Sequence, residues 1–273
     1  MIMTISIFKS RSSAHATSSE LNQVDLALVV DTTGSMGAFI EAARQHMVAL
    51  LQALTSEAAI PIELQVGLVE YRDHPPQDNS FVFREHALTA RLDHVQRDIA
   101  ALKPDGGGDG PEAVYDGLRG ACENLAWRAH SRRLAVLIGD APPHGITANG
   151  DAFPRGCPCG FTPDRTTALI EETNVTLYAI GLTPSVADIF GQLARYTGGA
   201  YFTADRMDAA IEAVQRVLQV EFADLTFDGQ VLQAYAAQSE HTIDALCVAL
   251  ATSRGRVAAS LSRLGRRGLL ETA

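Results

Sequence analysis

The motif DTTGS places an acid and two hydroxyls at alternate positions, Asp31, Thr33 and Ser35. An unbroken apolar run at 26–30 precedes the motif, and an amphipathic stretch to about residue 54 follows it. This pattern predicts a buried strand that turns into a helix. Carboxylate and hydroxyl oxygens are the hard ligands that a magnesium-sized cation prefers, so the turn is a candidate cation site.

Further acids follow the other predicted strands. Asp73 ends VGLVEYRD, Asp140 ends LAVLIGD, and Asp109 and Glu112 lie in the glycine-rich loop GGGDGPE before a helix. In an open α/β sheet, ligands bind beyond the carboxyl ends of the strands, so we expect these acids to lie at one edge. Crowded carboxylates repel one another unless a cation neutralises them. We therefore expect Glu112 or Asp109, together with Asp140, to complete the ligand shell, directly or through water.

A cation at this edge can serve recognition. Magnesium takes six oxygens in octahedral geometry and keeps some waters, one of which can be exchanged for a carboxylate of a partner protein. The simpler alternative is that Ser35 only caps the helix and that the acids are solvated. A cap does not explain why Asp109, Glu112 and Asp140 occur at the matching edge.

Apolar runs alternate with helical patterns over most of the chain. The predicted strands are 26–30, 65–71, 81–87, 134–138, 175–180 and 200–203, and the predicted helices are 35–55, 91–102, 112–127, 163–173, 186–196 and 207–222. This alternation predicts an α/β fold with a doubly wound, mostly parallel sheet flanked by helices. We expect a flexible N-terminal tail at 1–22, the α/β domain at 23–223 and a C-terminal helical segment at 224–273.

Composition restricts the environment and the partners. The 273 residues carry a formal net charge of −10, and no apolar run approaches the ~18 residues of a membrane span. Cys122 and Cys247 lie in predicted helices, and Cys157 and Cys159 are too close together to join distant elements, which predicts a reducing, cytoplasmic compartment. Residues 229–273 hold five Arg against three acids, a charge of +2, so the remainder carries −12. Only this end of the chain is a candidate nucleic-acid surface.

Three motifs in order, DTTGSM, GGGDGPEA and LIGDAPPHG, resemble the von Willebrand factor A domain with its metal-ion-dependent adhesion site. The resemblance covers roughly residues 24–222. It implies a non-enzymatic module in which Mg²⁺ (or Mn²⁺ or Ca²⁺) accepts an Asp or Glu of a partner protein. The family pattern is Asp-x-Ser-x-Ser, so Thr33 stands where Ser is usual and keeps the hydroxyl. The GGGDGPE stretch is similar to integrin β-subunit domains, which implies a second cation near Asp73, Asp109 and Glu112.

Two further motifs resemble the A domain of the von Willebrand A-type α-kinases. They are YRDH at 71–74 and GDAPPHG followed by CPCG, and no kinase domain occurs within the 273 residues. Bacterial proteins with A domains of this kind often act beside AAA+ ATPases of the MoxR type. The resemblance therefore implies a bacterial, intracellular complex that contains such an ATPase.

Asp31 also has a catalytic interpretation. Asp-x-Thr-Gly-Ser after a strand is similar to the phosphorylated-aspartate motif of P-type ATPases and haloacid-dehalogenase-like phosphatases, in which the Asp is the nucleophile. Phosphoryl transfer then needs a cationic side chain, usually Lys, but Lys9 and Lys103 lie away from the strand ends. The phosphatase form also has a second Asp where Thr33 stands. An aspartyl-phosphate phosphotransferase is the second alternative function.

The long irregular loop at 141–161 contains ligand-type side chains. His144, Cys157 and Cys159, with Asp151 nearby, are of the types that hold structural zinc. The spacing Cys-Pro-Cys differs from the common Cys-x-x-Cys. The alternative that we favour is a proline-ordered loop packed over the acidic edge.

Residues 243–250 and 253–265 show helical apolar periods separated by a short turn, which predicts a helix-turn-helix. The stretch ALATSRGRVAASLSRLGRRGLL resembles winged-helix transcription regulators of the MarR-like kind. The resemblance implies that polar residues of the second helix face DNA. The candidate DNA-binding residues are Arg254, Arg256, Ser260, Arg263, Arg266 and Arg267. The alternative, packing against the A domain or a partner protein, is favoured, so a DNA-binding regulator is the first alternative function.

Overall fold

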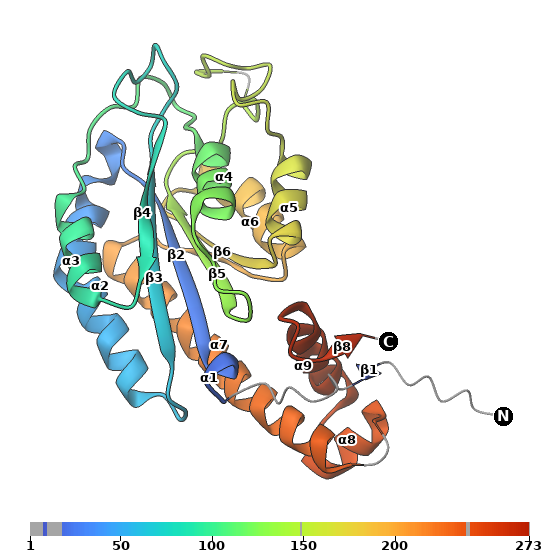
Figure 1. Ribbon diagram of the computed structural model, residues 1–273. Coiled ribbons are helices and arrows are strands. Elements are labelled where there is room, and N and C mark those ends of the chain that lie inside the picture. The colour runs from blue at the N-terminus through green and yellow to red at the C-terminus, as the bar shows by residue number, and fades with distance from the viewer. Residues whose placement is uncertain (1–7, 10–17, 148, 239–240, 273) are drawn as a thin grey trace.

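A computed structural model describes residues 8–9, 18–147, 149–238 and 241–272, and a six-stranded sheet forms its centre (Figure 1). The strand order is β4-β3-β2-β5-β6-β7. The strands are β2 (Gln23–Asp31), β3 (Glu63–Tyr71), β4 (Phe83–Thr89), β5 (Arg132–Gly139), β6 (Val175–Gly181) and β7 (Tyr201–Thr203). Within this sheet only the edge pair β3–β4 is antiparallel, so the predicted doubly wound, mostly parallel sheet is confirmed.

Helices cover both faces of this sheet (Figure 1). On one face lie α2 (Gly37–Glu57), α3 (Leu92–Ala101) and α7 (Met207–Ala237), and on the other lie α4 (Val114–Asn124), α5 (Pro163–Glu172) and α6 (Ala187–Tyr196). The short turns η1 (Gly34–Met36) and η2 (Pro184–Val186) lead into α2 and α6. In the central strand β2, Leu26 and Leu28 pack under the first layer, and Ala27 and Val29 under the second. Because successive side chains of a strand point to opposite faces, an unbroken apolar run suits this doubly covered position.

Helix α7 is longer than its sequence pattern predicts. It does not end near Phe222 but continues to Ala237, across the predicted domain boundary between 223 and 224. Phe222 belongs to the core under the sheet, whereas Phe227 and Val231 belong to a separate C-terminal core. Helix α7 thus contributes side chains to both hydrophobic cores. No described helix, α7 included, is long and apolar enough to cross a membrane.

Two short helices follow, α8 (Ile243–Leu250) and α9 (Arg254–Arg266), as predicted. The hydroxyls of Thr242 and Ser253 cap their first turns by accepting backbone hydrogen bonds. Ala251 adopts a left-handed conformation (φ 48°) that ends α8 and turns the chain into α9.

The two ends of the described chain meet. Strand β1 (Phe8–Lys9) pairs antiparallel with β8 (Glu271–Thr272), and α1 (Ser18–Leu21) leads into β2. These parts of the predicted N-terminal tail therefore have regular secondary structure. The rest of it, 1–7 and 10–17, lies outside the described residues.

A buried acid holds α9 against α7. Asp228 is fully buried and accepts hydrogen bonds from Ser260 Oγ at 2.6 Å and from Arg263 Nε and Nη2 at 3.0 and 2.6 Å. Arg263 also pairs with Asp224 at 2.9 Å. Two of the candidate DNA-binding side chains thus face α7.

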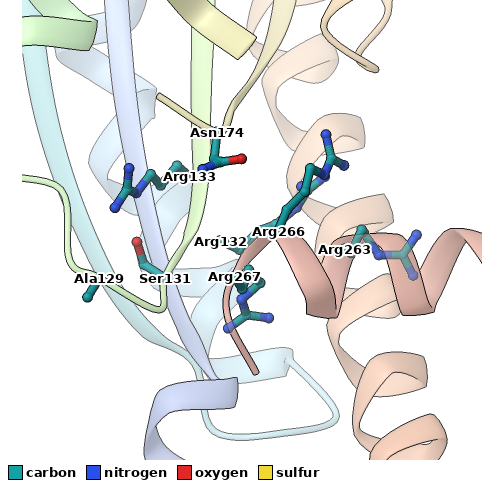
Figure 2. A pocket seen from close by; sticks show the side chains of 8 residues that line it. All are labelled: Ala129, Ser131, Arg132, Arg133, Asn174, Arg263, Arg266 and Arg267. Atoms are coloured by element: carbon teal, nitrogen blue, oxygen red, sulfur yellow. The ribbon is translucent and has the colours of Figure 1, made fainter. Parts of the chain in front are cut away.

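Arg267 is buried as well. Its guanidinium donates to the backbone carbonyls of His130, Glu20 and Leu21, which ties the end of α9 to the segment before β2. Figure 2 shows the basic pocket that this docking leaves near the start of β5. Its lining residues are Ala129, Ser131, Arg132, Arg133, Asn174, Arg263, Arg266 and Arg267.

The candidate DNA-binding residues of α9, which were the less favoured interpretation, therefore do not form a single exposed face. Arg254, Arg256 and Arg266 are exposed, whereas Ser260, Arg263 and Arg267 are buried. At about 3.6 residues per turn, Ser260 lies beside Leu264 on the helix surface and Arg263 lies about 100° from Leu264, so neither is opposite the apolar side chains. The period cannot reveal Asp228, the buried acid on another helix that binds both.

We predict that Asp228→Ala lowers the free energy of unfolding by about 3–5 kcal/mol, because it leaves the buried Arg263 guanidinium without its closest partner. Urea denaturation measures the change. Asp244→Ala is the matched control, since it removes the acid of the exposed Arg254–Asp244 pair and should change stability little. Equal losses in the two variants would contradict a structural role for the buried acid.

Candidate metal centre

The loop after β2 fixes one oxygen of Asp31 and leaves the other unbonded. The backbone N–H and the hydroxyl of Thr33 donate to Asp31 Oδ1 at 2.8 and 2.6 Å. Thr33 Oγ1 and Ser35 Oγ lie 3.4 Å apart. Asp31 and Thr33 are buried and Ser35 is exposed. The DTTGS motif therefore gathers carboxylate and hydroxyl oxygens at the end of the strand, as predicted.

The glycine-rich loop brings Glu112 to the same place. The Glu112 N–H donates to Pro142 O at 2.9 Å, which ties this loop to the segment after β5. Gly107 has φ +80°, and a Cβ atom there would lie 2.9 Å from Glu112 Oε1 and 3.2 Å from Thr33 Cβ. Only glycine accepts both this conformation and this close approach. The glycine run thus allows the loop to lie directly over Thr33.

Each of the five predicted acids has one buried carboxylate oxygen without a hydrogen-bond partner among the described residues. These atoms are Asp31 Oδ2, Asp73 Oδ2, Asp109 Oδ1, Glu112 Oε2 and Asp140 Oδ1. A buried polar atom without a partner is costly and rare in native proteins. Since these oxygens come from four segments at one sheet edge, the donor set fits a hard divalent cation.

The acids also raise one another's pKa. Burial raises the pKa of Asp31 to about 7, with added contributions from the charges of Asp140 and Asp73 and an opposing one from the hydrogen bonds of Thr33. Burial, then the charges of Asp31 and the other acids, raises the pKa of Glu112 to about 10. Without a cation the Glu112 carboxyl is therefore protonated at neutral pH. Binding a cation to these oxygens must release protons.

Tyr71 is a further polar group at this edge, and sequence reasoning missed it. Its side chain is fully buried and its hydroxyl has no partner among the described residues. Burial raises the pKa of Tyr71 well above its usual range, and the charges of Asp31, Asp140 and Glu112 raise it further. Tyr71 is the last residue of β3 and looks like an ordinary strand aromatic. Only the register, which pairs it with Asp31, places it here.

His144 lies between two acids. Its Nε2 is 2.6 Å from Asp73 Oδ1 and its Nδ1 is 2.9 Å from Asp151 Oδ1, and all three side chains are fully buried. Burial lowers the pKa of His144, but the hydrogen bonds and charges of the two acids raise it overall, which favours the imidazolium. The structure therefore groups Asp73 and Asp109 with His144, rather than with Glu112 as the predicted second cation site had them.

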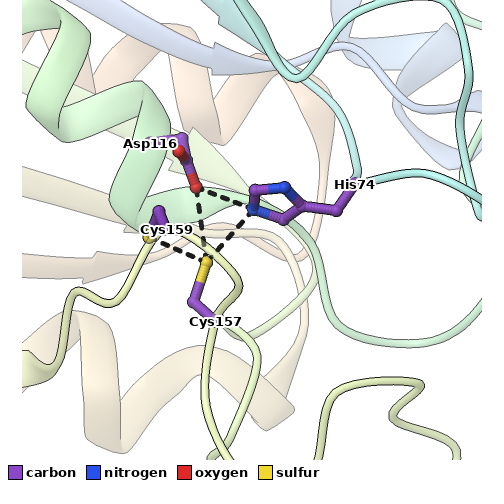
Figure 3. A group of neighbouring side chains, drawn as sticks. All are labelled: His74, Asp116, Cys157 and Cys159. Carbon is purple, nitrogen blue, oxygen red and sulfur yellow. Dashed lines mark hydrogen bonds and ion pairs between the residues drawn. The ribbon is translucent and has the colours of Figure 1, made fainter.

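The predicted zinc ligands Cys157 and Cys159 come together, but His144 does not join them. His74 and Asp116 do (Figure 3). The zinc prediction is wrong at His144 because both its ring nitrogens are engaged by acids. His74 follows β3 and Asp116 lies in α4, so only the fold brings them to the cysteines.

Comparisons with known proteins agree with this fold. Residues 25–146 match the family model of the von Willebrand factor A domain. The α-protein kinase vwkA of Dictyostelium discoideum is 31% identical over 160 residues, which cover 57% of this chain and 24% of that protein. A putative ariadne-like RING finger protein, R811 of Acanthamoeba polyphaga mimivirus, is 30% identical over 132 residues, covering 48% and 12%. The chain thus spans a quarter or less of these relatives.

Solved structures with the same fold share little sequence. The pilus adhesin SpaC of Lactobacillus rhamnosus GG has a TM-score of 0.52 and 19% identity, covering 75% of this chain and 30% of that one. Proximal thread matrix protein 1 from the mussel byssus, described with a zinc-occupied MIDAS motif, has a TM-score of 0.51 and 16% identity, covering 74% and 46%. These structures show a shared fold alone, and the family model identifies residues 25–146 as a von Willebrand factor A domain.

Proposed function

We propose that this protein binds a partner protein through a divalent cation, Mg²⁺ in the cell, at the carboxyl edge of its sheet. The observation that carries the proposal is the set of buried, unpartnered oxygens on the five acids of four neighbouring segments. Asp31, Thr33 and Ser35 supply ligands from the first loop. Glu112 and Asp140 complete the shell directly or through water. Mn²⁺ and Ca²⁺ suit the same oxygen donors.

The exposure of the donors favours recognition at the surface. Asp31, Thr33 and Glu112 are buried, whereas Ser35 is exposed and Asp140 is half-buried. The donor set is therefore mostly buried but reaches solvent at Ser35. A bound Mg²⁺ offers an open coordination position there, which an Asp or Glu carboxylate of a partner can take.

A metal-dependent role has support in one structural neighbour. The mussel byssus protein is described with zinc in its MIDAS motif. The identity is only 16%, so we carry over the idea of metal binding and not the metal. The choice of Mg²⁺ rests on the donor set, which at this site is all oxygen.

We further propose a cytoplasmic, bacterial complex as the setting and a AAA+ ATPase of the MoxR type as one partner class. The four cysteines are all free thiols, which suits a reducing compartment. The partner class follows from the resemblance of the sequence motifs alone.

The two alternative functions have less support. A phosphotransferase would need a cationic side chain at Asp31, whereas the groups that shift the pKa of this acid are Thr33, Asp140 and Asp73. We therefore propose that the protein is not an enzyme. A DNA-binding role would depend on α9, where three of the six candidate residues are buried.

We predict that Mg²⁺ stabilises the metal-free protein. At a concentration of about 100 Kd the gain is about 2.7 kcal/mol. For a chain of this size that corresponds to a rise in Tm of about 5–10 °C. Glu112→Gln should melt higher than wild type in chelator, because it removes an acid whose charged form is destabilised by burial and by its neighbours. The variant should gain less than wild type from Mg²⁺.

Differential scanning fluorimetry with and without Mg²⁺ measures both effects. Glu123→Gln is the matched control, since Glu123 is an exposed acid of α4 away from this edge and should keep the full Mg²⁺ gain. A wild type that does not respond to Mg²⁺, or a Glu112→Gln variant with the full gain, would count against the cation site.

Partner capture tests the function itself. We expect the wild type to retain a partner from a lysate of its own organism in Mg²⁺ and to release it in EDTA. Asp31→Ala and Thr33→Val should lose it, because each removes a ligand oxygen. Thr33→Ser keeps the hydroxyl and should retain it. Identical recovery with and without metal would end the proposal.

A further inference from the structure

A second cluster of metal-ligating side chains lies beside the carboxylate edge (Figure 3). His74 Nε2 is 2.9 Å from Asp116 Oδ2 and 3.2 Å from Cys157 Sγ. Cys157 Sγ is 3.3 Å from Asp116 Oδ2 and 2.9 Å from Cys159 Sγ. One ligand atom from each of the four residues lies within 4.8 Å of every other. Four donors thus converge on one point.

We infer that His74, Asp116, Cys157 and Cys159 form a structural zinc site. Two thiolates, an imidazole and a carboxylate are a donor set typical of Zn²⁺. Tetrahedral zinc with Zn–S of about 2.3 Å and Zn–N or Zn–O of about 2.0–2.2 Å separates its ligand atoms by about 3.3–3.8 Å. Four of the six separations are 2.9–3.3 Å, and the other two, from Cys159 to His74 and to Asp116, lie within 4.8 Å. Binding zinc therefore requires the ligand atoms to move apart, by about 0.9 Å for the two sulfurs.

The cluster has the closed character of a structural site. His74, Asp116 and Cys157 are buried, and Cys159 is half-buried. All four positions of a tetrahedral ion are filled by protein, so no position stays open for a substrate.

The surroundings balance the charge. Two thiolates and one carboxylate carry −3, and Zn²⁺ with the Arg119 guanidinium carries +3. Arg119 Nη2 lies 3.5 Å from Asp116 Oδ1, the oxygen that faces away from the sulfurs. The guanidinium also lies 5.7 Å from the ring centroids of Phe83 and of Phe161, which helps to orient it. A cation on the outer carboxylate oxygen is a common way to hold a metal-ligating acid.

The site explains how a long loop is held. Within its described residues, the chain from β5 to α5 has no helix or strand of its own, yet Cys157 near its end is buried. Zinc would join this loop to the loop after β3, through His74, and to α4, through Asp116. The two loops also carry the edge acids Asp73 and Asp140, and Glu112 lies just before α4. The zinc site itself does not depend on the proposed function.

A redox pair is the competing interpretation of Cys-Pro-Cys. The sulfurs are 2.9 Å apart and both thiols are free. A close pair of thiols suits either chemistry, but a redox pair does not need His74 and Asp116 to be gathered around the sulfurs.

Metal analysis of the full chain, purified without chelator under reducing conditions and after dialysis, tests the inference. We expect about one zinc per chain in the wild type and at least about tenfold less in Cys159→Ser. Cys247→Ser, which changes a half-buried thiol in α8, should keep its zinc. Asp31→Ala should also keep it. Zinc that is lost in Asp31→Ala and kept in Cys159→Ser would overturn the inference, because it would place zinc at the carboxylate edge.

Cobalt substitution can be carried out on the wild-type protein, so its main result does not depend on whether a variant folds. Co²⁺ added to the reduced, metal-free wild type should give the intense visible bands of a tetrahedral ion and the near-ultraviolet charge-transfer band of a cobalt–thiolate bond. Cys159→Ser should lose the charge-transfer intensity and Cys247→Ser should keep it. Absence of zinc together with absence of these bands would overturn the inference. A disulfide between Cys157 and Cys159 that forms again when the reduced protein is given zinc, detected as a mass two hydrogens lower, would overturn it as well.

Discussion

Repulsion between buried carboxylates at one edge of the sheet is the constraint on which the rest of the site depends. Parallel strands deliver Asp31, Asp73 and Asp140 to the same edge, and a glycine-rich loop adds Glu112. Burial and mutual charge raise the pKa of Asp31 to about 7 and that of Glu112 to about 10. A fold that gathers acids in this way needs positive charge. The domain supplies part of it and leaves the remainder to a cation.

The positive charge comes from two sources, a histidine of the protein and a cation from solvent. On one side His144 lies between the enclosed acids Asp73 and Asp151. Burial lowers the pKa of His144, but the hydrogen bonds and charges of these acids raise it overall and favour the imidazolium. On the other side Asp31 and Glu112 keep unpartnered oxygens near the exposed Ser35, where an ion from solvent can enter.

The sequence was sufficient for features that depend on local pattern. Strand ends predicted the edge with Asp31, Asp73 and Asp140, because the carboxyl ends of parallel strands meet there. The glycine-rich loop before a helix predicted Asp109 and Glu112. Features that depend on pairing across the fold were missed. His74 contacts Cys157 although the two residues lie on segments that are distant in sequence. Ser260 faces inward because it donates a hydrogen bond to Asp228 on another helix. A periodicity shows which face of a helix is polar, but not which polar face has a buried partner.

The most direct test is a crystal structure of the full chain grown with Mn²⁺, which scatters anomalously and prefers similar oxygen donors. We predict an anomalous peak about 2.1–2.2 Å from oxygens of the DTTGS loop. Glu112 and Asp140 should contact this ion directly or through one water. A crystal with Mn²⁺ bound only at Asp73, Asp109 and His144, or with no peak beside Asp31, would contradict the account.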